Sequence, residues 1–122
     1  MPKQITIEME SETLKAELND SATAQALAEK LPLTVSMSRW GDEYYGSCGL
    51  DAALGDGARD VMEVGELAYW PTGDALCIFF GPTPVSMDDE PRAASAVNPL
   101  GRLLDDPTPL KSMPATLRMT LS

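Results

Sequence analysis

The sequence predicts an all-β protein, a barrel of seven or eight short strands with two brief helices. Several segments carry apolar residues at every second position, which is the period of a half-buried strand. Two central segments, 67–70 and 75–80, are apolar at successive positions and need cover on both faces. A barrel provides that cover, because one face of each strand fills the lumen and the other can meet the helices.

The N-terminal third predicts a hairpin followed by a helix. Residues 4–10 alternate strictly, and residues 14–18 alternate again after a short connection. The period then changes to i, i+3, i+4 and i+7, which is the apolar stripe of a helix. The stripe consists of Ala24, Leu27, Ala28 and Leu31. Asp20 or Ser21 can cap the start and Pro32 stops the helix, which we expect to cover one open end of the sheet.

The middle of the chain alternates between strands and irregular segments. Residues 33–39 return to period two, whereas 40–61 are rich in glycine and predict a long irregular segment with one short strand near Tyr44. After the central pair of strands, residues 82–98 are predicted as a second long connection. A strand or edge segment is expected over residues 96–103.

The C-terminal segment predicts a brief helix and a closing strand. Residues 105–114 contain three prolines, so any helix there is short. Residues 115–121 alternate once more and complete the sheet.

Composition limits the classes of function. The 122 residues predict one domain over 1–122, and the net charge of −10 disfavours nucleic acid and anionic membranes as partners. No membrane span or signal peptide is recognised, so we expect a cytoplasmic protein. The chain has no histidine, which removes histidine triads and the usual zinc sites. We expect no metal and no cofactor, and the oligomeric state is not indicated.

The remaining metal-binding residue types do not form a recognisable site. Cys48 and Cys77 lack metal spacing, and we expect both to be free thiols, with Cys77 in the core. The acidic run 88–90 lacks the spaced ligands and the glycine of a calcium loop. We interpret that run as a solvated loop tip.

Four segments together resemble the small prokaryotic cyclophilin-like proteins, over roughly residues 4–121. They read AEKLPL, SRWGDEYYG, VGELAYWPTGDALCIFFGPTP and ASAVNPLGRL, of which the third is the most specific. The resemblance implies a closed eight-stranded barrel with a helix at each end, in agreement with the order of elements above.

The resemblance extends to the fold more than to the activity of cyclophilins, which isomerise X-Pro bonds. Their site uses an arginine, a glutamine on a strand, lining phenylalanines, a loop tryptophan and usually a histidine. The matching strand is 75–80, where Leu76 and Cys77 stand in place of the amide. No histidine exists and no tryptophan follows Phe80. The fold is therefore implied, while most of the isomerase machinery is missing.

The candidate ligand-binding residues are an arginine and several aromatics: Arg39, Tyr44, Tyr45, Tyr69 and Phe79. Arg39 can hold a carbonyl or a carboxylate through its planar fork, or can instead be a surface arginine lying over Trp40. The tyrosines, with Trp70, can line a groove for an apolar or proline-like side chain, or can pack in the core and barrel rim. Core packing is the plainer role for Phe79 and Phe80.

Three functional hypotheses follow. The leading one is a binding domain that holds a peptide segment or a small-molecule ligand in a groove beside Arg39. The second is a weak prolyl isomerase, which would need a side-chain amide or second donor near Arg39; Gln25 and Asn98 are the candidates. The third is a non-catalytic subunit of a larger assembly, which would show an exposed apolar patch.

Overall fold

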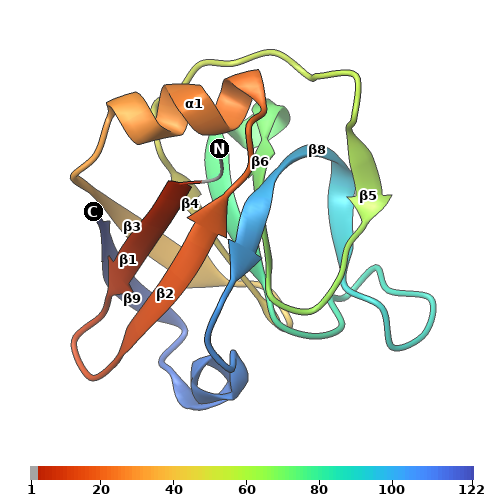
Figure 1. Cartoon of the computed structure of the whole chain (residues 1–122). Helices are drawn as coiled ribbons and strands as arrows, with labels where there is room; N and C mark the ends of the chain where they lie inside the picture. The colour runs from red at the N-terminus through yellow and green to blue at the C-terminus, as the bar shows by residue number, and fades with distance from the viewer. Residues whose placement is uncertain (1–2) are drawn as a thin grey trace.

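A computed structural model describes residues 3–122 and confirms the mainly β architecture (Figure 1). The strands are β1 Lys3–Glu8, β2 Thr13–Leu18, β3 Leu33–Arg39, β4 Glu43–Ser47, β5 Arg59–Val61, β6 Glu66–Trp70, β7 Ala75–Phe79, β8 Arg92–Leu103 and β9 Thr116–Leu121. The helices are α1 Ala22–Glu29 and two 3₁₀ helices, η1 Pro71–Gly73 and η2 Thr108–Ser112.

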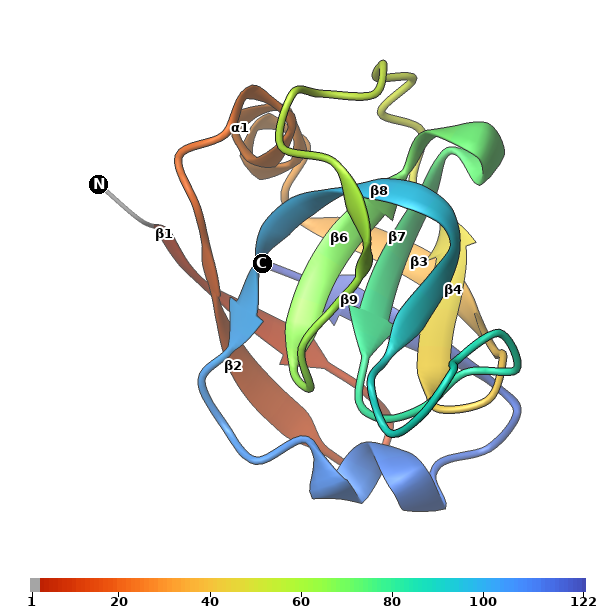
Figure 2. The same ribbon diagram turned by 90° about the vertical axis from the view of Figure 1, so that its right-hand side faces the viewer.

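Eight antiparallel strands close into a ring, as predicted. Their order is β1-β2-β8-β6-β7-β4-β3-β9, and β9 pairs with β1 again. Strand β5 stands outside the ring and pairs with the first half of β8. That half of β8 arches over the outer surface of β6 and β7 (Figure 2). β8 therefore belongs to the barrel wall at its C-terminal end and to an outer layer at its start.

The alternation along β6 and β7 divides the apolar side chains between two cores. Leu67 and Ile78 point into the lumen, where they pack with residues from every other wall strand. Cys77 and Phe79 point outward and pack with Ala93 and Val97 of β8. The central strands are thus covered on both faces, as expected. The outer cover differs from the prediction, because it is the arch of β8 and not the helices.

The helices lie at the two ends of the barrel, α1 at one and η2 at the other (Figure 1). Ser21 caps α1, with its Oγ accepting a hydrogen bond from the backbone N–H of Ala24 at 3.2 Å. Ala24 and Leu27 are buried in the lumen core, so α1 covers the open end as predicted. Within residues 3–122 no helix is long and apolar enough to cross a membrane.

Two elements differ from the sequence-based expectation. The segment 40–61 contains the expected strand near Tyr44, which is β4, but also the three-residue strand β5. The connection predicted over 82–98 ends earlier, because β8 already starts at Arg92. The early part of β8 consists largely of alanine and serine, which have little strand propensity. These small side chains allow the arch to lie close to the barrel.

Gly101 permits the closure of the barrel. It lies opposite Leu18 where β8 meets β2, with φ at +154°. A Cβ atom on this residue would stand 1.9 Å from the carbonyl oxygen of Glu17. Only glycine allows the two backbones to approach so closely. The seam between β2 and β8 therefore depends on the absence of a side chain at position 101.

The lumen core should be sensitive to loss of volume at β7. Ile78 is 1% exposed, and Ile78→Ala is expected to lower the free energy of unfolding by about 2–5 kcal/mol, through lost burial and the cavity left behind. Urea unfolding followed by circular dichroism measures this. The exposed Val61 of β5 provides a control, since Val61→Ala should change stability by less than about 0.5 kcal/mol. Equal small effects at both positions would contradict the described core.

Candidate functional site

A cavity of about 270 Å³ opens on the outer face of the barrel, between the wall strands β4 and β7 and the arch of β8. It is lined by Trp40, Glu43, Tyr45, Trp70, Cys77, Ala93, Ala94 and Val97. The lining is mostly apolar and includes both tryptophans of the chain. An apolar, partly enclosed hollow with a single carboxylic acid has the form of a small-ligand site. We call it the outer cavity.

The strand period places these side chains. Along β4, Tyr44 points into the lumen core, while its neighbours Glu43 and Tyr45 point outward to the cavity. Cys77 is the partner of Tyr45 on β7, so the two share one face of the sheet. The facing wall comes from β8, where Ala93 and Val97 also belong to the outer core.

Glu43 is the chemically distinctive residue of the outer cavity. Glu43 is only 5% exposed, and its Oε1 is buried without a hydrogen-bond partner. Burial raises the pKa of this carboxyl from 4.5 to about 7, and a hydrogen bond with the Cys77 thiol opposes part of that rise. Buried polar atoms normally have partners, so an unpartnered carboxyl oxygen on a cavity-lining residue makes Glu43 a candidate site residue.

Cys77 lies beside Glu43 and is held in its neutral form. Burial raises the pKa of this thiol well above its usual value, and the neighbouring Glu43 raises it further. A neutral thiol is a weak hydrogen-bond donor and a poor nucleophile. Cys77 and Cys48 are both buried and free, which confirms the expectation of unbridged thiols.

The aromatic wall at Trp70 is fixed by its surroundings. The indole Nε1–H donates to the Ser95 Oγ of β8 at 2.7 Å. The indole ring also lies against Gly73, where a Cβ atom would stand 2.6 Å from it. Trp70 therefore bridges the end of β6 and the arch of β8, and a fixed aromatic surface suits ligand binding.

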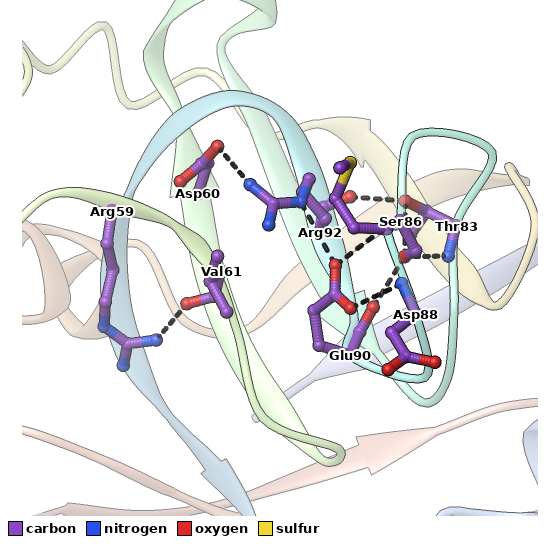
Figure 3. A network of polar contacts seen from close by, with 9 residues as sticks. Arg59, Asp60, Val61, Thr83, Ser86, Asp88, Glu90 and Arg92 are labelled. Carbon is purple, nitrogen blue, oxygen red and sulfur yellow. Dashed lines mark hydrogen bonds and ion pairs between the residues drawn. The ribbon is translucent and has the colours of Figure 1, made fainter.

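A polar network anchors the start of β8, which forms the roof of the cavity (Figure 3). Arg92 donates to Glu90 and to Asp60 of β5, each at 3.1 Å. The Glu90 carboxylate also accepts the backbone N–H groups of Met87 and Asp88, each at 2.8 Å. The acidic run predicted as a solvated tip is in part an ordered turn. Among residues 3–122 no group of acidic or cysteine side chains could hold a metal ion.

Arg39 is engaged in structural contacts. Its Nε donates to the Gly41 carbonyl at 2.8 Å, and its Nη1 donates to the Lys111 carbonyl at 3.0 Å. Its Nη2 pairs with Asp42 Oδ1 at 2.7 Å, and the guanidinium lies 5.1 Å from the ring centre of Phe80. The arginine thus ties the barrel rim to the segment containing η2. It does pack on an aromatic, which is Phe80 and not Trp40.

Three of the other predicted residues lie inside the protein. Tyr44 and Tyr69 are fully buried in the lumen core, and Phe79 is fully buried in the outer core. Tyr44 donates to the Pro114 carbonyl, and Tyr69 donates to Asp74, so both phenols have structural partners. Burial, with the Asp74 carboxylate second, raises the pKa of Tyr69 to about 12.

The outer cavity receives one of the five predicted residues, Tyr45, which is 36% exposed at its edge. Ligand binding by the other four, Arg39, Tyr44, Tyr69 and Phe79, stays a prediction. None of these four residues lines the outer cavity. Sequence reasoning missed Glu43, Trp40 and the β8 residues. The available signal was an acid directly before two tyrosines on a strand, but such a residue is usually solvated.

Glu43 should make the stability of the protein depend on pH. Its folded-state pKa of about 7 lies above the ordinary 4.5, so the folded protein binds more protons between these values. The stability that this group contributes is fully present below about pH 4.5 and is lost as the pH rises through about 7. The free energy of unfolding falls by on the order of 3 kcal/mol across this range. Glu43→Gln should remove this dependence and be the more stable form at high pH.

Urea unfolding of both forms across this pH range measures the effect. Glu8→Gln, at an exposed position of β1, makes the same charge change and should leave the pH profile parallel to that of the unmodified protein. If the pH profile of Glu43→Gln is also parallel to that of the unmodified protein, the raised pKa of Glu43 is contradicted.

Comparisons with known proteins agree with this architecture. A family model described as Cyclophilin-like matches residues 3–122. The chain is also similar to the hypothetical protein AF2241 from Archaeoglobus fulgidus, whose solution structure has a TM-score of 0.83 and 34% sequence identity. That similarity covers 99% of this chain and 94% of the other. No curated protein matches at a significant level. The match along almost the whole chain shows that this protein belongs to the cyclophilin-like family.

Proposed function

We propose that the protein is a binding domain, and that the outer cavity holds an apolar group of a small molecule or of a peptide. The observation that carries this proposal is the cavity itself, which is apolar, partly enclosed and walled by both tryptophans. Burying an apolar group there gains roughly 25 cal/mol for each Å² removed from water. The carboxyl of Glu43, the one carboxylic acid of the lining, would supply a polar contact that fixes the orientation of the ligand.

The position of the cavity also supports binding. Its floor is the rigid sheet of β4 and β7, and its roof is the arch of β8, anchored through Arg92. A site on such preformed elements loses little entropy when a ligand enters. The proposed site therefore lies on the outer face of the barrel and does not use the guanidinium of Arg39.

Two observations favour binding over prolyl isomerisation. The fork of Arg39 is engaged with Gly41, Asp42 and Lys111. The two side-chain amides that could assist it have other partners. Gln25 donates to the Asp20 carbonyl beside α1. Asn98 donates to Thr23 and Ala53 and accepts from Gly55. These contacts support a domain that uses the fold for recognition.

Filling the outer cavity should abolish ligand binding. Ala94 is an exposed residue of the lining, so Ala94→Phe can block the cavity without burial of a new side chain in the core. Both tryptophans line the cavity, and their fluorescence reports its occupancy. We expect cyclohexylamine or cyclohexanol to change this fluorescence in the unmodified protein and not in Ala94→Phe.

Ala53→Phe is the matched control, because Ala53 is exposed and lies outside the lining. It should bind the probe that the unmodified protein binds. If neither probe binds the unmodified protein, or if Ala94→Phe binds as well as Ala53→Phe, the outer cavity is not the binding site.

The isomerase alternative has its own test. Over residues 3–122 the protein offers neither a free arginine fork nor a second donor beside it. The loss of one transition-state contact alone lowers an enzyme's rate by a factor of about 100 or more. We expect no rate above background in a proline-peptide assay at micromolar protein concentration. Arg39→Ala should abolish any trace that is seen. A robust rate that survives Arg39→Ala would show that the protein is an isomerase with its site elsewhere.

A further inference from the structure

We propose that the outer cavity selects a positively charged ligand, an ammonium group carried on an apolar body, which pairs with the Glu43 carboxylate. This inference rests on the proposed function and names the chemical class of the ligand. The same chemistry occurs in a free organic amine and in a lysine side chain of a peptide. The experiment below separates these two sources.

Glu43 has unfilled hydrogen-bonding capacity. Its Oε1 is buried and unpartnered, while the adjacent Cys77 offers only a weak thiol donor. A carboxylate that is buried and unpaired destabilises a protein, and a cation with N–H donors would remove that penalty. A purely apolar ligand would leave the oxygen unpartnered.

The described residues that line the cavity supply no cation of their own. The lining contains no lysine or arginine. Three arginines are paired elsewhere, Arg39 with Asp42, Arg59 with Glu66, and Arg92 with Asp60 and Glu90. The opposite charge at Glu43 is therefore left for a ligand to provide. The net charge of −10 also attracts cations to the surface and disfavours an anionic ligand.

The aromatic wall of the cavity also suits a cation. Trp40, Tyr45 and Trp70 line the same cavity as Glu43. Aromatic faces attract ammonium groups, and tryptophan does so most strongly. The apolar body of the ligand would lie against Ala93 and Val97 of β8, which leaves its charged end free to reach the carboxylate. One wall thus suits the charge and the other suits the hydrocarbon.

The test compares two probes of the same shape, cyclohexylammonium and cyclohexanol, by tryptophan fluorescence titration. At about pH 8.5 an alkyl ammonium is still charged and Glu43 is ionised. The unmodified protein should bind the ammonium about tenfold to a hundredfold more tightly than the alcohol, the usual worth of a hydrogen bond to a charged group. This comparison needs no variant, so it does not depend on the folding of one.

The variant Glu43→Gln keeps the shape of the side chain and removes its charge. It should lose the preference for the ammonium while it still binds cyclohexanol. Glu8→Gln, which changes an exposed glutamate of β1, should keep the full preference. Equal affinity of the unmodified protein for both probes, or an unchanged preference in Glu43→Gln, would overturn the inference. Binding of neither probe would instead defeat the proposed function itself.

A third ligand distinguishes the two sources of the ammonium group. Lysine with an acetylated amino end and an amidated carboxyl end presents the side chain as a peptide does. If it binds more tightly than cyclohexylammonium and Glu43→Gln weakens it, the ligand is a peptide lysine. If only cyclohexylammonium binds, the ligand is a free amine. Both results support recognition of the charge by Glu43.

Discussion

The close approach of β8 to β2 at Gly101 is the constraint on which the rest of the structure depends. The pairing of these strands closes the ring and removes two open edges. It is possible only because position 101 carries no side chain beside the Glu17 carbonyl. Once the C-terminal half of β8 is fixed in the wall, its first half must leave the wall and arch over the outer face (Figure 2). The outer core and the outer cavity exist because of that arch.

The two faces of β7 serve different layers of the fold. Ile78 packs in the lumen core, while Cys77 faces outward beside the cavity. The outer layer is thinner, because it is built from the small side chains of β8. Incomplete filling there leaves room for a ligand and leaves Glu43 without a partner. A buried acid that lowers stability is best explained by a function that needs it.

The period of the apolar residues was sufficient to predict the hairpin of β1 and β2, the helix α1, β3 and a barrel of seven or eight strands. Family resemblance added the closed ring of eight. The same rules could not find the first half of β8, because Ala93 and Ala94 carry no strand signal and are placed by their packing on the barrel. They also could not place Glu43, since only the arch makes an outward strand position buried. Tyr44 and Tyr45 were both predicted as ligand residues, but only Tyr45 lines the cavity, whereas Tyr44 points into the lumen core.

The most direct test of this account is the titration of the Glu43 side-chain carboxyl carbon by nuclear magnetic resonance, with and without cyclohexylammonium. We expect a pKa of about 7 for this carboxyl in the free protein, raised by burial. Added cyclohexylammonium should lower that pKa, because a bound cation stabilises the carboxylate, while cyclohexanol should not. A carboxyl that titrates near its ordinary 4.5 and does not respond to the ammonium would contradict the central claim.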